Sequence, residues 1–399
     1  MDRIVIIGAG QAAASLAAKL RALGHEGPVT VLGEEPVAPY QRPPLSKAYL
    51  LGEMGLDRLM LRGADWWGDQ RIDLRTGTRA TAIDRAARTV TAGDEVLPYD
   101  TLVLATGSRP RRLPAAIGGD LAGVHVVRTL ADVDAMAPDL AAGRRLLIVG
   151  GGYIGLEAAA VAAKLGLQVT LIEAAPRILG RVASVETAAW FRNLHAGHGV
   201  TIREGVALDR LTGEGRVTGA RLADGKEIAA DVVILGVGIA PADDLARAAG
   251  IACDNGIAVD ATGRTSDPAI WAAGDCASFP FGGGRLRLES VGNAIDMAEA
   301  VAANILGAGR PYLPKPWFWS DQYDVKLQIA GLNIGHDRVV TRAGGAGISF
   351  WYYAGEQLLA VDAANDPRAY MIGKRLIEAG RSAPPDLVAD PATELKALL

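Results

Sequence analysis

Cysteine is almost absent from this chain of 399 residues. The only two, Cys253 and Cys276, are too far apart to form a Cys-x-x-Cys or Cys-x4-Cys pair, so the sequence carries neither a disulfide framework nor a redox pair of that kind. So few cysteines are typical of proteins from a reducing compartment, and we expect the cytoplasm.

Long apolar runs and an excess of positive charge are missing as well. No uninterrupted apolar run reaches about 18 residues, which argues against a membrane-spanning helix. The formal net charge is −4 and no polybasic run occurs, so neither nucleic acid nor a membrane surface is an expected partner. An apolar strand begins at Arg3, so we expect no signal peptide. The length suits two or three domains.

Two glycine fingerprints dominate what is present, one in residues 3–13 and one in residues 146–157. Each runs from an apolar strand into an Ala/Leu-rich helical stretch, and a second apolar strand then ends at an acid. A dinucleotide needs this βαβ context, because the tight turn and the helix N-terminus bring backbone N–H groups close to the pyrophosphate. We therefore predict two bound dinucleotides, one of which can reduce the other. The fingerprint positions are Gly8, Gly10 and Ala13 in the first unit, and Gly150, Gly152 and Gly155 in the second.

A further buried strand that ends in glycine follows each fingerprint, at residues 100–107 and 231–238. This repetition predicts two copies of one nucleotide-binding fold. A third strand pattern, within residues 265–275, delivers Asp275 at its end, where ligands of open α/β sheets bind. From about residue 318 the pattern becomes β-rich alternation followed by one helix. The expected class is α/β, with two Rossmann-like domains and a C-terminal α+β domain. The expected strands cover 3–7, 29–33, 100–107, 144–175 in part and 231–238, and the expected helices 11–23, 291–306 and 368–379.

Three further stretches narrow the interpretation: residues 39–47, 287–294 and 316–322, the last reading Pro-Trp-Phe-Trp-Ser-Asp-Gln. With the fingerprints, and in the same order along the whole chain, they resemble the FAD-dependent NADH:ferredoxin reductases of the glutathione-reductase structural class. This is the putidaredoxin reductase and biphenyl dioxygenase ferredoxin reductase type, which serves bacterial cytochromes P450 and Rieske oxygenases.

The resemblance implies FAD at the first fingerprint and NADH at the second. It also implies a discontinuous FAD-binding domain of residues 1–112 and 242–317, an NAD-binding domain of 113–241 and a C-terminal interface domain of 318–399. Because no cysteine pair is present, electrons are expected to leave the flavin directly, and the resemblance implies that they pass to a [2Fe–2S] ferredoxin. A monomer is the default expectation.

On the FAD side, an acid at the end of the second strand can bind the adenosine ribose. Glu34 and Glu35 both fit the spacing, and the resemblance favours Glu34. The helix that begins at Val291 would direct its positive dipole end at the flavin. The FAD residues implied are Gly8, Gly10, Ala12, Ala13, Glu34, Arg42, Lys47, Ala80, Thr106, Gly107, Arg128, Gly274, Asp275 and Val291.

On the NAD side, Glu173 occupies the corresponding place and would repel a 2′-phosphate, so NADH is expected over NADPH. Arg177 and Arg181 follow in the sequence, and their positive charges could weaken the repulsion of a 2′-phosphate. Tyr153 either gates the nicotinamide or only packs. The NAD residues implied are Gly150, Gly152, Tyr153, Ile154, Gly155, Glu157, Glu173, Arg181 and Gly238.

Lys47, Glu157 and Trp319 form the predicted catalytic set. Glu157 is expected in the first turn of an otherwise apolar helix, where it has no polar face to occupy, so it should be buried and need a cation. The resemblance supplies Lys47 as that cation, beside the flavin, and places Trp319 near the electron exit. We expect the pair to act by position and charge.

Other groups receive structural interpretations. Cys276 is expected to be a buried filler, and His195 and His198 lack the companions of a metal site, so no metal is predicted. Because ferredoxins of this type are acidic, a local basic patch is expected, although Glu299 would oppose it. Alternative functions are a rubredoxin reductase, an NADH oxidase, or an NADH-binding flavoprotein like apoptosis-inducing factor. The patch candidates are Arg285, Arg287, Arg310, Lys315, Lys326, Lys374 and Arg375.

Overall fold

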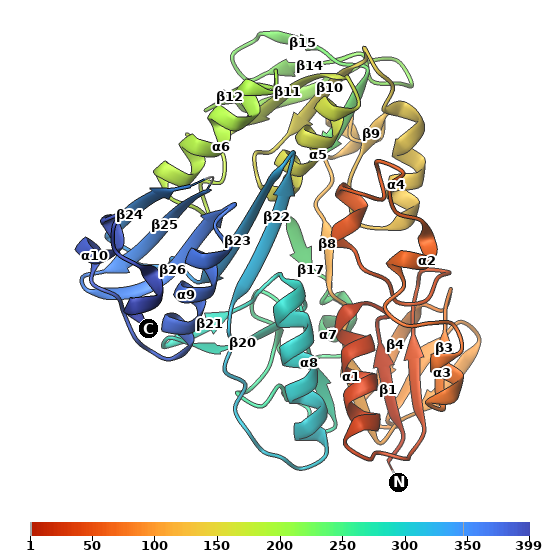
Figure 1. Cartoon of the computed structure of the whole chain (residues 1–399). Helices are drawn as coiled ribbons and strands as arrows, with labels where there is room; N and C mark the ends of the chain where they lie inside the picture. The colour runs from red at the N-terminus through yellow and green to blue at the C-terminus, as the bar shows by residue number, and fades with distance from the viewer. Residues whose placement is uncertain (1, 346) are drawn as a thin grey trace. The chain divides into compact units, whose positions relative to one another are not determined.

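The structure is a computed structural model that describes residues 2–345 and 347–399. Contacts divide the chain into two units, each with its own strands and helices (Figure 1). Unit 1 holds the residues up to Gln41, together with Leu56–Arg109 and Ile239–Pro316. Unit 2 holds Arg42–Gly55, Pro110–Gly238 and Trp317–Leu399.

A five-stranded parallel sheet in the order β19-β7-β1-β2-β3 forms the centre of unit 1. Its middle strands are short runs of four residues, and every residue of β1 and β7 is buried. Apolar runs of this kind are typical of parallel strands that are covered on both faces. The strands are β1 (Ile4–Ile7), β2 (Val29–Leu32), β3 (Ile72–Arg75), β7 (Thr101–Leu104) and β19 (Ile270–Ala272).

Helices α1 (Gln11–Ala22) and α8 (Val291–Ile305) lie side by side in unit 1 (Figure 1). Both helices are rich in alanine, and small side chains allow close approach. The smaller elements are α2 (Leu56–Leu59), α3 (Trp66–Asp69), α7 (Asp244–Ala248), the sheet β4 (Ala80–Asp84), β5 (Thr89–Ala92) and β6 (Glu95–Pro98), the sheet β18 (Ile257–Ala258), β20 (Ala277–Phe281) and β21 (Gly284–Leu286), and the pair β8 (Ser108–Pro110) and β17 (Ile239–Pro241).

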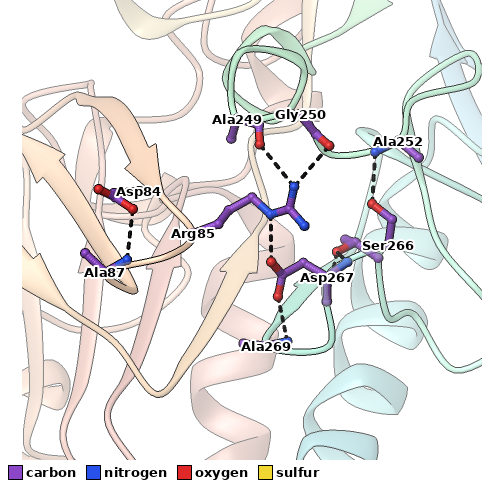
Figure 2. A network of polar contacts seen from close by, with 10 residues as sticks. Asp84, Arg85, Ala87, Ala249, Gly250, Ala252, Ser266, Asp267 and Ala269 are labelled. Carbon is purple, nitrogen blue, oxygen red and sulfur yellow. Dashed lines mark hydrogen bonds and ion pairs between the residues drawn. The ribbon is translucent and has the colours of Figure 1, made fainter.

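One polar network joins the β4–β5 hairpin to the approach to β19 (Figure 2). The guanidinium of Arg85 donates to the carboxylate of Asp267 at 2.7 Å and to the carbonyls of Ala249 and Gly250, just after α7. The second oxygen of Asp267 accepts the N–H of Ala269 at 3.0 Å. The network therefore fixes the loop that leads into the strand preceding Asp275.

Unit 2 contains a second parallel sheet, in the order β12-β11-β10-β16-β9. Its central strands β10 and β16 are almost wholly buried, as in unit 1. The strands are β9 (Val124–His125), β10 (Arg145–Val149), β11 (Gln168–Glu173), β12 (Thr201–Glu204) and β16 (Val232–Leu235), with α4 (Leu130–Met136), α5 (Tyr153–Lys164), α6 (Val185–Gly197) and the small sheet β13 (Leu208–Thr212), β14 (Gly219–Leu222) and β15 (Glu227–Ala229).

The rest of unit 2 is an antiparallel sheet in the order β22-β23-β26-β25-β24. Helix α9 contacts β26 and β23. The core here is aromatic, because Trp351, Tyr352 and Tyr353 of β25 are fully buried. The elements are β22 (Trp317–Gln322), β23 (Val325–Gly331), β24 (Arg338–Gly344), β25 (Gly347–Ala354), β26 (Gln357–Ala364), α9 (Pro367–Glu378) and α10 (Pro385–Ala389).

The predicted fold class is confirmed: the chain has two Rossmann-like parallel sheets and a C-terminal antiparallel sheet with a helix. The predicted domain bounds remain a prediction. Within the described ranges, no helix has the length and the apolar character that crossing a membrane requires.

Candidate active site

The first fingerprint forms a turn that only glycine can make. Gly8 has φ +110°, and a Cβ there would lie 2.1 Å from the carbonyl oxygen of Ala105 on the neighbouring strand's end. Gly10 is different, because a Cβ on it would meet nothing within 4 Å. The turn is thus closed on the side facing the sheet and open at the start of α1, where a pyrophosphate would approach.

The second fingerprint repeats this geometry. Gly150 has φ +108°, and its Cβ would lie 2.4 Å from the carbonyl oxygen of Gly236. A Cβ on Gly155 would lie 2.2 Å from the carbonyl oxygen of Gly150, which explains why the helix packs so closely on the strand. Gly152 again faces open space. Both turns therefore fit a dinucleotide.

The predicted acids of unit 1 lie in different environments. The side chain of Glu34 is 57% exposed, and its nearest cation is Arg79 at 3.8 Å. The carboxylate of Glu35 accepts the hydroxyl of Tyr40 at 2.5 Å. Glu35 is therefore engaged in a hydrogen bond to the loop that follows, whereas Glu34 faces solvent just after β2. This difference favours Glu34 for a ligand, but its role stays a prediction.

Asp275 follows β19 and accepts the hydroxyl of the buried Ser108 at 2.9 Å. Thr106 donates its hydroxyl to the carbonyl of Ala242 at 2.6 Å, and Gly107 beside it has φ +69°. Asp275 and Thr106 therefore follow the carboxyl ends of two neighbouring parallel strands, and a strand end is where Asp275 was expected.

The other predicted FAD residues are placed by their elements. Ala12 and Ala13 are buried in α1, and a Cβ on Gly274 would lie 3.0 Å from the Cβ of Ala12. Val291 begins α8, whose N-cap is the Ser290 hydroxyl. Ala80 begins β4 in unit 1, whereas Arg42 and Arg128 both belong to unit 2, where the Arg42 guanidinium donates to the Arg128 carbonyl at 2.7 Å.

Glu173 ends β11 and binds the second fingerprint itself. One carboxylate oxygen accepts the N–H of Gly151 and the other accepts the N–H of Ala175, both at 2.7 Å. Arg177 donates to the carbonyls of Ser184 and Gly180. Its guanidinium is therefore already used by the backbone, which lessens its capacity to offset the carboxylate.

The remaining predicted NAD residues surround the same turn. Ile154, in the first turn of α5, is 42% exposed. Gly238 has φ +93°, and a Cβ there would lie 3.9 Å from the guanidinium of Arg181. Both features leave this end of the sheet accessible to a ligand.

Lys47 and Glu157 form a buried ion pair within unit 2. The ammonium lies 2.8 Å from Oε2 of Glu157, and the two side chains are 16% and 5% exposed. The predicted pairing is confirmed. The predicted place of Glu157 in the first turn of its helix was wrong, because α5 begins at Tyr153 and Glu157 is its fifth residue. The second turn is more deeply covered, which strengthens the need for a cation.

Two serines that the sequence analysis missed complete this site. Ser46 donates its hydroxyl to Oε2 of Glu157 at 2.7 Å, and Ser320 donates to Oε1 at 2.7 Å. A carboxylate can only accept, so both hydroxyls must donate to it. The carboxylate is thus held by two hydroxyls and one ammonium. Neither serine was singled out from the sequence, although Ser46 lies in the stretch 39–47 and Ser320 in the stretch 316–322 that carry the resemblance.

The aromatic residues near this site lie on both faces of β22. Trp319 stacks on Trp317 with ring centroids 5.5 Å apart. The ring of Tyr153 lies 4.9 Å from that of Phe318. The Tyr153 hydroxyl is buried without a hydrogen-bond partner among the described residues, and burial raises the pKa of this phenol. Tyr153 therefore packs against the C-terminal sheet, and a gating role stays a prediction.

Several predicted basic-patch residues are engaged internally. Arg285 donates to the carbonyl of Val259 at 2.7 Å, Arg287 pairs with Glu289 at 2.5 Å, and Lys374 pairs with Glu378. Glu299, the expected opposing charge, pairs with Lys19 at 3.1 Å. Arg310, Lys315, Lys326 and Arg375 are the remaining candidates, and they are divided between the two units.

The cysteine and histidine interpretations can also be placed. Cys276 is fully buried in the core of unit 1. His195 is fully buried, and burial lowers its pKa to about 4, so it is neutral at pH 7. Across residues 2–345 and 347–399, no group of three or more His, Cys, Asp or Glu is arranged to hold a metal ion.

Comparison with known proteins identifies the family. Residues 2–298 match the pyridine nucleotide-disulphide oxidoreductase model, and residues 317–399 match the reductase C-terminal model. A ferredoxin–NAD(P)(+) reductase of Sphingomonas sp. is 44% identical over 98% of this chain and 96% of its own length. Putidaredoxin reductase of Pseudomonas putida is 41% identical over 100% of this chain and 97% of its own.

A solved structure agrees with these relatives. The reductase in the covalent putidaredoxin reductase–putidaredoxin complex matches with a TM-score of 0.96 and 40% identity, covering 100% of this chain and 98% of that one. The chain therefore belongs to the pyridine nucleotide-disulphide oxidoreductase family and, within it, to the ferredoxin reductases, which use a flavin and a pyridine nucleotide.

Proposed function

We propose that this chain oxidises NADH, holds FAD at the first fingerprint and reduces a [2Fe–2S] ferredoxin. One observation carries the proposal: the same closed-then-open glycine turn is built twice, at Gly8–Gly10 and Gly150–Gly152, in a chain without a cysteine pair. When bound, a flavin accepts two electrons together and releases them one at a time, which is the conversion that a one-electron acceptor requires.

For FAD, the backbone of the first turn approaches the pyrophosphate, because Gly10 leaves the start of α1 open. Glu34 accepts hydrogen bonds from the adenosine ribose, and Asp275 accepts them from the ribityl chain. The N-terminal end of α8 stabilises negative charge by up to about 2 kcal/mol in a partly buried site. These groups would hold the cofactor, and the end of α8 would favour negative charge on it.

For NADH, Glu173 binds the ribose through its carboxylate. Two backbone N–H groups already fix the orientation of that carboxylate, so it cannot turn away from a 2′-phosphate at little cost. Because Arg177 is engaged with backbone carbonyls, it offers that phosphate little compensation. NADH is therefore preferred over NADPH.

Lys47 acts through the position of its charge. The two serine hydroxyls hold the Glu157 carboxylate, and this carboxylate and the Pro43 carbonyl hold the ammonium within unit 2. A positive charge that is fixed and poorly hydrated interacts strongly with charge that develops nearby during hydride transfer. Hydride transfer needs no proton donor, so we assign Lys47 no acid–base step.

The partner follows from the relatives. Putidaredoxin reductase has been captured in a covalent complex with putidaredoxin, and the Sphingomonas relative is named for ferredoxin. We propose a [2Fe–2S] ferredoxin for this chain, with Trp319 on the path of electron exit. A monomeric state and a cytoplasmic location stay predictions from the sequence.

The test measures NADH-dependent reduction of cytochrome c by the purified, flavin-loaded protein, with and without [2Fe–2S] ferredoxins. Rapid reduction only when a ferredoxin is present is the expected result. Rapid reduction without any ferredoxin would count against a ferredoxin reductase, and no turnover with any ferredoxin tested would favour a flavoprotein that binds NADH without serving such a partner. Either result contradicts the proposal.

A variant tests the role of the buried charge. Lys47→Met should slow reduction of the flavin by NADH by roughly a hundredfold, because the variant loses a buried, charge-assisted interaction. FAD content should stay at the parent level. Stopped-flow absorbance measures the rate, and an unchanged rate would remove Lys47 from the mechanism.

A further inference from the structure

The strand β22 carries a row of buried polar residues on one face. Phe318, Ser320 and Gln322 alternate along it and therefore share a face. That face contacts the fingerprint helix and α6 of unit 2, because Ser320 binds Glu157 on α5 and Gln322 binds His195 on α6. Ser320 and Gln322 are no more than 1% exposed.

These contacts form one continuous hydrogen-bonded chain. It begins at the Tyr323 hydroxyl, which lies 3.0 Å from Nδ1 of His195. Nε2 of His195 lies 2.7 Å from Oε1 of Gln322, and Nε2 of Gln322 donates to the Ser320 hydroxyl at 3.0 Å. Ser320 then donates to Glu157 at 2.7 Å. The chain spans two helices and one strand and ends at the carboxylate of the buried ion pair.

The carboxylate fixes the direction of every link. Because Glu157 can only accept, the Ser320 hydroxyl must donate to it and must therefore accept from the Gln322 amide nitrogen. The amide oxygen then faces His195, whose Nε2 must carry the proton. A neutral imidazole has one N–H, so Nδ1 must accept from Tyr323. Every donor in the chain thus points toward Glu157.

A chain of this kind orients a group better than it conducts protons. A side-chain amide cannot pass a proton on without an unfavourable tautomer, so Gln322 interrupts any relay between His195 and Ser320. The amide has a different property: its donor and acceptor are fixed relative to each other. It therefore transmits one orientation from the imidazole to the serine hydroxyl, and so to the carboxylate.

We propose that Gln322 and His195 are positioning residues for the buried ion pair, which they hold in one geometry through Ser320. The proposal rests on the proposed function for what the Lys47 ammonium does in hydride transfer. It adds that the C-terminal sheet, through β22, sets the position of that ammonium.

The first experiment determines the donor-to-acceptor direction of these hydrogen bonds and does not depend on catalysis. ¹⁵N NMR of histidine-labelled protein at pH 7 has only five residues to resolve, and His195→Gln identifies the signal in question. The expected spectrum shows a neutral His195 with its proton on Nε2. A proton on Nδ1 would mean that the hydrogen bonds run in the opposite direction, and it would overturn the proposal whatever the activity of the enzyme.

The second experiment measures the effect on flavin reduction. Gln322→Met keeps the side-chain length and removes both hydrogen bonds. It should slow NADH-dependent flavin reduction about tenfold, with NADH affinity and FAD content unchanged. The matched control is Gln328→Met, the same replacement on the adjacent strand β23. In the control, the rate should stay within about twofold of the parent.

A double variant separates positioning from general packing. If Gln322 acts through the ammonium, Gln322→Met should have almost no further effect on the rate when Lys47 is already Met. An equal tenfold loss with and without Lys47 would overturn the proposal, as would an unchanged rate in the single variant. Failure of the proposed function would look different, because the parent flavin would then not be reduced by NADH at all.

Discussion

Asp362 is a buried carboxyl group whose removal should change how stability depends on pH. It lies on β26, is 1% exposed, and accepts hydrogen bonds from the Tyr352 hydroxyl and, at 3.0 Å, from the Thr187 hydroxyl of α6. Burial raises the pKa of Asp362 from 3.8 to about 6, although its hydroxyl partners and the nearby His336 oppose the rise. The folded protein therefore binds a proton here that the unfolded chain has already lost.

The direction and size of the effect follow from this difference. Because the pKa is raised in the folded state, the stabilisation is fully present below about pH 4 and is lost as the pH rises through about 6. A difference of about two pKa units corresponds to roughly 3 kcal/mol. Asp362→Asn has nearly the same shape and does not titrate. Relative to the parent, it should gain about 3 kcal/mol of stability between pH 4 and pH 7.

The contribution of His195 to stability changes with pH in the opposite direction, which provides an internal check. Burial lowers its pKa from 6.5 to about 4, so its stabilisation is present above about 6.5 and is lost as the pH falls through about 4. In the parent, these two contributions to the free energy of unfolding change in opposite directions between about pH 4 and pH 6. Asp362→Asn should expose a rising slope, and Asp362→Asn combined with His195→Gln should remove most of it.

Native-state hydrogen exchange of the β25 and β26 amides measures these free energies, even if the two units unfold separately. The series should cover pH 4 to 8, with His198→Gln, at the residue that follows α6, as the control. Parallel curves for the parent and Asp362→Asn would refute the reasoning, because Asp362 would then titrate in the folded protein as it does in the unfolded chain.

Three further predictions concern the fingerprints and unit 1. Gly8→Ala should prevent proper folding of unit 1, because its Cβ would clash with a carbonyl oxygen at 2.1 Å, whereas Gly10→Ala should fold normally yet bind FAD weakly; circular dichroism and flavin content distinguish the two. Glu173→Gln should lower the preference for NADH over NADPH by about tenfold, measured as the ratio of kcat/KM values, and an unchanged ratio would contradict the ribose assignment. Arg85→Ala should lower the stability of the flavin-loaded protein by about 1–2 kcal/mol, seen as release of FAD at a lower urea concentration, because Asp267 loses its cation; a midpoint equal to that of the parent would make this network dispensable.

The sequence predicted those features whose causes are local. Gly8 and Gly150 were found because a strand, a glycine turn and a helix follow one another directly, and both glycines do adopt positive φ. Glu157 was expected to be buried with a cation because its helix is otherwise apolar, although Lys47 itself came from the family resemblance. The structure confirms this pairing at 2.8 Å.

The missed features depend on contacts between distant segments. Ser46, Ser320 and Gln322 lie in stretches that carry the family resemblance, but nothing local marks them as partners of Glu157 and His195. Their roles arise only when β22 lies against the fingerprint helix and α6. His195 was weighed only as a metal ligand and set aside. Alternation in β22 gave no usable signal, because Ser320 and Gln322 make their face more polar than the opposite face, which carries Trp317 and Trp319.

Helix α6 has a consequence for how proteins of this kind can be recombined. The side chains of its Thr187 and His195 reach buried partners on the C-terminal sheet, so this helix and that sheet share one interior. The two family models divide the sequence before residue 317, yet unit 2 continues across that division and also includes residues 42–55. A hybrid enzyme joined at residue 317 would therefore take α6 from one parent and the C-terminal sheet from another, although the two pack into a single core. Exchanging all three segments of unit 2 together keeps that core from one parent.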